Sequence, residues 1–328
     1  MNKVVKTALQ VVLPFALGCF ILYWVYRDFN FQQVRQALFQ QMHWGWMIIS
    51  LFFGVMGHVF RGWRWKLTLE PIGEHPRTSN CVDAIFLSYA TNLIIPRIGE
   101  VSRCGVLAKY DNVSFAKSLG TVVTERIIDT LLVAIITAVT LLVQLPIYLK
   151  FFHETGAKIP SLTYLFTTPW FYVILFSSIG VIILLIYFLR MFSFYKKVKG
   201  TIMNLWEGIL SLRKVNNKSL FILYTLLIWL CYFLHFYLTF YCFAFSEHLG
   251  VLAGLVMFVG GTFAVIVPTP NGTGPWHFAI ITMMMLYGVS ATDASLFALL
   301  VHGIQTLLVI VLGVWGWGHL QYKNKMAK

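Results

Sequence analysis

The sequence predicts an all-α, polytopic membrane protein, and three observations carry that prediction. Of its 328 residues, 59% are hydrophobic and only 11% are charged, whereas a soluble domain has about 45–50% apolar and about 25% charged residues. The mean hydropathy is +0.76. Several uncharged runs reach the roughly 20 residues that an α-helix needs to cross a bilayer. These values exclude a soluble enzyme, a secreted disulfide scaffold and a disordered chain.

In chain order, seven runs are long enough to span a membrane: 7–26, 42–60, 127–149, 170–189, 219–245, 249–267 and 295–318. The first follows Lys3 and Lys6, as a signal peptide does, but its length favours a retained helix. Two further apolar stretches, 82–95 and 276–290, are shorter and are flanked by proline and glycine. We expect 276–290 to cross as well, which gives about eight spanning helices. Residues 81–126 form either a re-entrant hairpin or two short crossings.

Basic residues predict the orientation of these helices. Sixteen of the 25 Lys and Arg lie near the N-terminus, in 61–80, in 190–218 and in the C-terminal tail. Cytoplasmic loops carry an excess of Lys and Arg, so both termini are predicted to be cytoplasmic in a multi-pass protein of the cell (inner) membrane. Two termini on the same side require an even number of crossings, which is why 276–290 is counted as one.

The whole chain, 1–328, is expected to be one transmembrane domain. Between residues 194 and 212, apolar residues recur at every third or fourth position, and lysines crowd the other face. Segment 190–218 is therefore predicted to be an amphipathic helix. It either lies on the anionic cytoplasmic leaflet or packs against the bundle as a linker helix.

The first interrupted segment follows Asn92 and contains Pro96, Arg97, Glu100 and Arg103. Proline suits the first turn of a helix. A half-helix that begins at Pro96 would place the three charged residues on one face, at successive i, i+3 positions. The positive end of a helix dipole favours an anion there.

A second charged group opens the 127–149 run, where Glu125, Arg126 and Asp129 occur together. Arg126 and Asp129 can pair at i, i+3, and Glu125 and Asp129 repel each other at i, i+4. That repulsion suggests a cation between them, from the chain or from solution. Ionisable residues at membrane depth indicate either a functional site or a structural lock, here between Arg97 or Arg103 and the two carboxylates.

The second interrupted segment lies in the other half of the chain, at Pro270, and contains Gly272, Gly274, Pro275 and His277. Backbone N–H groups in a glycine-rich turn can form an anion-binding nest. Two short, proline-interrupted segments in separate halves of a chain indicate a midplane substrate site of the kind found in repeat-built transporters. No sequence repeat is visible beyond Pro96 and Pro270.

Other residues suggest simpler roles. Arg61, Arg64 and Trp65 are predicted to be an interfacial anchor at the cytoplasmic end of the second helix. His235 and His302 are predicted to be packed, hydrogen-bonded residues. The five cysteines have no CxxC spacing and lie in or near apolar runs, so we predict no disulfide, no metal site and no cofactor.

With these residues in view, the chain resembles the flippase-like family, the transmembrane domain of lysylphosphatidylglycerol synthases. The matching pieces occur in order over essentially the whole length: Arg61…Arg64-Trp65, Asn92…Pro96-Arg97-x-Gly99-Glu100-x-x-Arg103, Glu125-Arg126-x-x-Asp129 and Pro268-x-Pro270-x-Gly272-x-Gly274. This chain has Pro270-Asn271-Gly272 where the family usually has Pro-Gly-Gly, and His277 where it often has a glutamate.

The resemblance implies that the chain handles lipids with charged headgroups and moves them between leaflets. Full-length synthases also carry a soluble domain that uses aminoacyl-tRNA. This chain has no room for one, so we expect that it does not make aminoacyl lipids by itself.

We therefore predict a lipid translocase and not an enzyme, without an ATPase of its own because no Walker loop is present. The residues expected to bind the headgroup are Asn92, Arg97, Glu100, Arg103, Glu125, Arg126, Asp129, Gly272, Gly274 and His277. The expected partners are membrane lipids, with a homo-oligomer left open, and no nucleic acid.

Two alternatives stay open. One is a membrane-embedded enzyme, or enzyme subunit, acting on phospholipid or polyprenyl-phosphate headgroups with a divalent cation on Glu125 and Asp129. The other is a secondary transporter of small solutes, which interrupted helices support equally well.

Overall fold

The computed structural model of the protein describes residues 3–27, 29, 32–155 and 215–326, with a few isolated positions between the last two ranges. These residues are helical and contain no strand, which confirms the predicted fold class. The expected crossing at 170–189 and the amphipathic segment 190–218 lie almost entirely outside the described residues.

The described helices follow one another in this order: α1 Lys3–Tyr26, α2 Gln32–Gln36, α3 Trp44–Leu69, α4 Thr78–Thr91, α5 Gly99–Asp111, α6 Phe115–Val143, α7 Leu145–Thr155, α12 Lys218–Tyr237, α13 Val251–Ala264, α14 Pro275–Leu286 and α15 Ala291–Met326. Four of the described helices are long and apolar enough to cross a membrane when the short 3-10 turns that continue two of them are included. They span Trp44–Ile72, Phe115–Val143, Lys218–Cys242 and Ala291–Lys325. The protein is an integral membrane protein.

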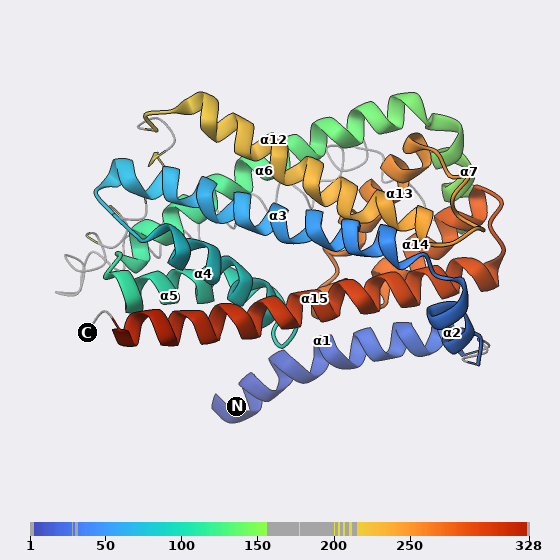
Figure 1. Ribbon diagram of the computed structural model, residues 1–328, viewed down its shortest axis with the longest axis horizontal. Helices are drawn as coiled ribbons and strands as arrows, with labels where there is room; N and C mark the ends of the chain where they lie inside the picture. The colour runs from blue at the N-terminus through green and yellow to red at the C-terminus, as the bar shows by residue number, and fades with distance from the viewer. Residues whose placement is uncertain are drawn as a thin grey trace.

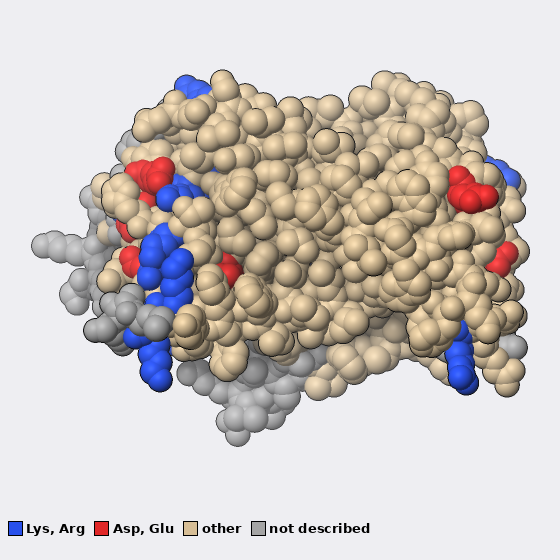
Figure 2. Space-filling view, viewed as in Figure 1, with Lys and Arg blue, Asp and Glu red and all other residues tan. Residues whose placement is uncertain are grey.

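These four long helices run along the longest dimension of the molecule, as Figure 1 shows. Helices α4 and α5 lie at the end that holds the C-terminus, which we call the basic end. Helices α13 and α14 lie toward the other end, the opposite end. On the face shown in Figure 2, charged side chains gather near the two ends and leave an uncharged surface between them. That surface is suited to the hydrocarbon core of a bilayer.

Helices α13 and α14 form a short antiparallel hairpin at the opposite end, packed against each other. They have 14 and 12 residues, or about 21 and 18 Å of helix, and a bilayer core is about 30 Å thick. The predicted full crossings at 249–267 and 276–290 are therefore wrong. The chain reverses at the proline and glycine residues between the two helices, so the pair enters and leaves on the same side.

Helices α4 and α5 form the matching hairpin at the basic end, with 14 and 13 residues. They also pack against each other. Of the two arrangements left open for 81–126, the structure has the re-entrant hairpin.

The two hairpins belong to an inverted structural repeat. Helices α3, α4, α5 and α6 correspond in order to α12, α13, α14 and α15, and the offset between their first residues is nearly constant along the chain. In Figure 1, α3 runs toward the basic end and α12 runs away from it, whereas α6 and α15 run in the reverse directions. Each half is thus a long helix, a re-entrant hairpin and a second long helix. Inverted-topology repeats of this kind are typical of membrane transporters.

Local backbone features repeat with the same offset. Arg97 and Asn271 each follow a proline, occupy equivalent places in the two halves and have positive φ values of 65° and 52°. Ser114 and Ser290 each accept a hydrogen bond from the backbone N–H of the third residue after them, at the starts of α6 and α15. A non-glycine residue in the left-handed region is uncommon. The shared conformation at both turns indicates one backbone design used twice.

Two apolar clusters fill the interior. One lies between α3, α12, α13, α14 and α15 and includes Met47, Phe236, Phe240 and Phe297. The other lies at the basic end and includes Trp65, Leu69, Ile85 and Leu107. All five cysteines are free thiols, and four of them are buried, so they serve as small apolar side chains in the packing.

Candidate functional site

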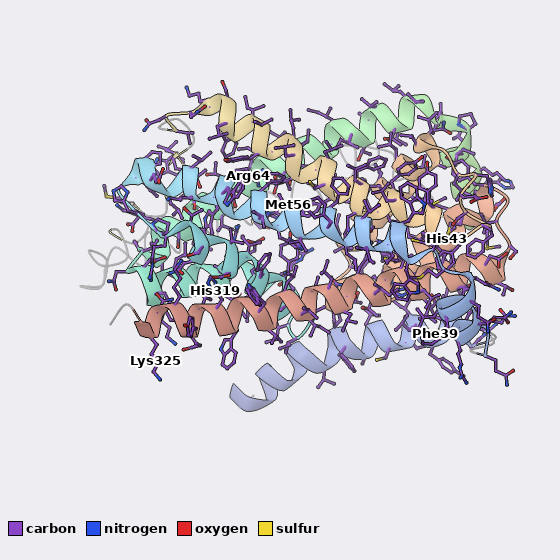
Figure 3. The ribbon with its side chains drawn as sticks, viewed as in Figure 1. Phe39, His43, Met56, Arg64, His319 and Lys325 are labelled. Atoms are coloured by element: carbon purple, nitrogen blue, oxygen red, sulfur yellow. The ribbon has the colours of Figure 1, made fainter. Side chains whose placement is uncertain are left out.

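The structure brings seven ionisable residues together inside the half that contains α3, α5 and α6. We call this group the charged cluster, and its members are Arg61, Arg64, Glu100, Arg103, Glu125, Arg126 and Asp129. Figure 3 places Arg64 on the part of α3 that lies toward the basic end. Glu100 and Arg103 lie in the first two turns of α5, which begins at Gly99. Glu125, Arg126 and Asp129 lie on α6.

Asp129 is held by three guanidinium groups. Arg61 binds Oδ2 directly, Arg64 Nη1 lies 2.8 Å from Oδ1, and Arg126 Nη2 lies 2.9 Å from Oδ2. Arg64 also donates to the Thr225 hydroxyl of α12 at 3.1 Å. The carboxylate therefore ties α3 to α6 through charge-assisted hydrogen bonds.

Glu125 is held by two guanidinium groups on its other side. Arg103 Nη1 lies 3.0 Å from Oε2, and Arg64 Nε lies 3.5 Å from Oε1. Arg103 also pairs with Glu100 at 2.8 Å, and its guanidinium lies 4.6 Å from the Trp65 ring centroid. The cation expected between Glu125 and Asp129 thus comes from the chain itself, mainly as Arg64.

The charged cluster carries one uncompensated positive charge, because it contains four arginines and three carboxylates. Most of its side chains are almost fully buried, but Arg126 is 41% exposed and Glu100 is 32% exposed. Buried charge of one sign is costly in a low-dielectric interior. A bound anion would offset this surplus charge, and it could approach only where the cluster is exposed, at Arg126 beside Glu100.

Polar groups from other helices complete the wall around Arg61. It donates to the hydroxyl groups of Tyr89 and Tyr232, and the Tyr232 hydroxyl lies 3.3 Å from His58 Nδ1. The two tyrosines belong to α4 and α12, so the guanidinium connects both halves of the molecule.

Arg97 lies apart from the charged cluster, at the tip of the α4–α5 hairpin. Its guanidinium donates to the carbonyl oxygen of Ile266 at 3.0 Å, so it joins the tips of the two hairpins. The expected ladder of Arg97, Glu100 and Arg103 is wrong in this respect, because α5 starts after Arg97. Only Glu100 and Arg103 share the helix face. Within the described part of the chain, Arg97 has no carboxylate partner.

Asn92 and Gly99 explain how this tip is held. The Asn92 side chain accepts a hydrogen bond from the Gly99 N–H at 2.8 Å and so caps α5. A Cβ on Gly99 would overlap the Ser88 carbonyl oxygen, so α4 and α5 can meet this closely only with glycine there. The Asn92 side chain, predicted to bind the headgroup, is thus engaged with the backbone at the start of α5.

The tip of the α13–α14 hairpin is uncharged. Gly272 and Gly274 have positive φ values of 71° and 96°, and the Gly274 N–H donates to His277 Nδ1 at 3.3 Å. His277 is buried and its ring centroid lies 4.5 Å from that of His302, which contacts the Asn271 carbonyl at 3.1 Å. The predicted hydrogen-bonded, packed histidine at His302 is confirmed, and so is His235, which contacts Ser50 at 3.1 Å.

Arg61, Arg64 and Trp65 are not an interfacial anchor. All three are buried, and the Trp65 indole donates to Thr121 at 2.9 Å. Helix α3 continues through them to Leu69, which carries their side chains into the bundle. The i, i+3 spacing of the two arginines on a long apolar helix was the signal that could have placed them opposite Glu125 and Asp129.

Metal binding by the carboxylates has no structural support in the described residues, which contain no group of three or more His, Cys, Asp or Glu side chains able to hold a metal ion. Glu125 and Asp129 instead use their oxygens to bind arginines. The arrangement can bind an anion at its exposed edge and at Arg97.

Comparison with known proteins gives two matches. The family model described as "Lysylphosphatidylglycerol synthase TM region" matches residues 11–313. The "UPF0104 membrane protein MJ1078" of Methanocaldococcus jannaschii is 25% identical over 236 residues, which cover 69% of this chain and 91% of that protein. No solved structure matches the chain.

Proposed function

The chain belongs to the family of the lysylphosphatidylglycerol synthase TM region, and from that premise we propose that it moves a lipid with an anionic or otherwise charged headgroup between the two leaflets. The observation that carries the proposal is Arg97. This exposed cation lies at the meeting point of two re-entrant hairpins that enter from opposite ends, and its hydrogen-bond acceptor is a backbone carbonyl.

The energetic argument concerns charge at membrane depth. A charged side chain there is costly unless it is paired, and it generally lies on the path of a charged substrate. Among the described residues, Arg97 donates only to the Ile266 carbonyl oxygen, and the charged cluster has one surplus positive charge. A lipid phosphate that moves along this path would gain electrostatic stabilisation, while its acyl chains stay in the bilayer.

The proposed headgroup path combines Arg97 with the charged cluster, and Asn92 shapes the tip that carries Arg97. The glycines and the histidine at the other tip, Gly272, Gly274 and His277, form its boundary. We propose the basic end as the cytoplasmic side, in the cell (inner) membrane and with both termini cytoplasmic, because Lys and Arg are concentrated there. Membrane lipids are then the ligands, and transport is passive or ion-coupled.

Reconstitution tests this function. Purified protein in vesicles that contain a fluorescent phosphatidylglycerol should speed the loss of label protection against a membrane-impermeant quencher, relative to protein-free vesicles. Arg97→Gln should abolish most of that gain while the amount of folded protein stays near wild type. The matched control is Arg35→Gln on the exposed helix α2, which should behave as wild type.

Three outcomes would contradict the proposal. They are wild-type vesicles that translocate no faster than protein-free ones, cleavage of the headgroup by the protein, and uptake of a soluble anion without lipid movement. The second would favour the membrane-embedded enzyme, and the third would favour the small-solute transporter.

A further inference from the structure

An apolar groove of about 470 Å³ runs along α6 next to the exposed edge of the charged cluster. Its walls are mainly aliphatic, and the ionisable side chains among its described lining are Glu100 and Arg126; the aliphatic lining includes Leu119, Val123, Ile127 and Leu131. Ile127 and Leu131 are 53% and 60% exposed. The groove therefore opens on the surface that faces lipid.

Arg126 presents a free cationic edge to this groove. Its Nη2 pairs with Asp129 at 2.9 Å and its Nε lies 3.5 Å from Glu100, a separation at which Nε makes no hydrogen bond. Within the described residues, Nη1 has neither a hydrogen bond nor an ion pair. The surplus positive charge of the charged cluster is therefore accessible at this one side chain.

We propose that this groove is a binding site for a glycerophospholipid, with one acyl chain along α6 and the phosphodiester on Arg126. The site rests on the proposed function and deepens it, because it specifies the phosphate as the group that is recognised. A phosphodiester carries one negative charge and would make the charged cluster neutral. An arginine–phosphate contact is also among the stronger charge-assisted pairs.

The depth of the site fits a lipid that is leaving its leaflet. Arg126 lies about three helical turns beyond the start of α6 at Phe115, or about 16 Å along the helix axis. The groove extends from Leu119 on the basic-end side of Arg126 to Leu131 on the other side. A phosphate on Arg126 would thus lie below the interface, with apolar walls on both sides for an acyl chain.

The aliphatic lining of the groove favours a lipid over a free anion as the occupant. A soluble phosphate would have to reach Arg126 across aliphatic side chains that face the hydrocarbon core. It would gain nothing from them, whereas the acyl chain of a lipid packs against them without leaving the hydrocarbon. The aliphatic lining therefore discriminates between the two sources of the same chemical group.

Native mass spectrometry of the full-length protein with added phosphatidylglycerol tests the site through two independent variants. Arg126→Gln removes the guanidinium that would bind the phosphate. Leu131→Trp fills the groove and leaves all charges in place. Each should retain about tenfold less lipid than wild type. The control is Leu142→Trp, the same change on the same helix at a side chain that is 83% exposed and outside the groove; it should retain lipid as wild type does.

Unchanged retention in Leu131→Trp would overturn the site, and this variant decides the question if Arg126→Gln does not fold. Displacement of the lipid by soluble glycerol 3-phosphate at equal concentration would also overturn it, in favour of a free-anion site. The proposed function fails separately. If the protein retains lipid specifically but does not translocate it in the vesicle assay, the site stands and the proposed function is refuted. If the protein translocates lipid but Leu131→Trp retains as much lipid as wild type, the proposed function stands and the site is refuted.

Discussion

The two inverted halves build the same hairpin from different chemistry. At the basic end, α5 and α6 are joined by Arg103 and Glu125 at 3.0 Å. In the other half, α14 and α15 are joined by the rings of His277 and His302, with centroids 4.5 Å apart, and by Trp276, whose centroid lies 5.1 Å from that of His302. Because the uncharged half holds its hairpin by aromatic packing and backbone hydrogen bonds, ionic groups are not required for this fold.

The comparison indicates what the charges are for. A buried ion pair is often no more stabilising than well-packed apolar residues of similar volume. The charged half keeps four arginines and three carboxylates where the other half does without them. The proposed function assigns these residues to ligand binding, and variants of the uncharged half provide the control for the structural part of their effect.

Asp129→Asn should give the largest loss of stability, because it leaves Arg61, Arg64 and Arg126 without their shared carboxylate. Breaking a buried pair in this way costs about 3–5 kcal/mol. Thermal unfolding in detergent would measure the loss, with Asp293→Asn in the first turn of α15 as the control. Adding Arg126→Gln to Asp129→Asn restores the original net charge and should recover part of the stability. No recovery would contradict the charge-balance argument.

Gly99→Ala tests whether close backbone approach, and not charge, sets the position of α5. Its Cβ would overlap the Ser88 carbonyl oxygen, and overpacking of this kind typically costs about 1–3 kcal/mol. Gly105 is a matched control on the same helix, because a Cβ there meets nothing within 4 Å. Gly105→Ala should leave stability unchanged or raise it by up to about 1 kcal/mol. Equal effects at both positions would refute the close-contact explanation.

His277→Leu tests the contribution of a buried polar side chain to the stability of the uncharged half. It removes the acceptor for the Gly274 N–H and should cost about 1 kcal/mol, well below the loss at Asp129. His277→Gln keeps an acceptor and should lose less, as measured by the same unfolding curves. A loss at His277 as large as that at Asp129 would show that the two halves do not differ in the way proposed.

Replacing the residues at the two tips by glycine should have the smallest effects on stability. Arg97→Gly relieves a non-glycine residue at positive φ but also loses the hydrogen bond to the Ile266 carbonyl oxygen, so the net change in stability should stay within about 1 kcal/mol. Asn271→Gly gains less, since asparagine tolerates this region and its side chain donates to the Thr306 hydroxyl at 3.0 Å. A loss of stability at Arg97 as large as that at Asp129 would contradict this expectation.

Composition and uncharged runs predicted the fold class, since they reflect the bilayer directly. They failed at 249–267 and 276–290, where an unbroken apolar run does not reveal that the helix stops at Ala264 and turns back. Residue spacing correctly paired Arg103 with Glu100. The same spacing puts Arg61 and Arg64 on one face of a long apolar helix, but their ion pairs with Asp129 and Glu125 depend on how α3 packs against α6.

The inverted repeat was also invisible in the sequence. Residues at equivalent positions differ in chemistry, as Arg97 and Asn271 do, and only the backbone conformation is shared. Both halves bury apolar residues, but their interiors use different chemistry, with ion pairs in one and aromatic rings in the other. Only the two prolines, Pro96 and Pro270, marked the relation.

The most direct test of the account compares phosphatidylglycerol translocation by Arg97→Gly and Asn271→Gly in vesicles. Both variants place glycine at a positive φ in equivalent turns, so they differ mainly in the side chain that is lost. We predict that Arg97→Gly translocates at least about tenfold more slowly than wild type, while Asn271→Gly stays near the wild-type rate. Equal rates in the two variants, whether both lost or both retained, would contradict the claim that the charged half carries the lipid.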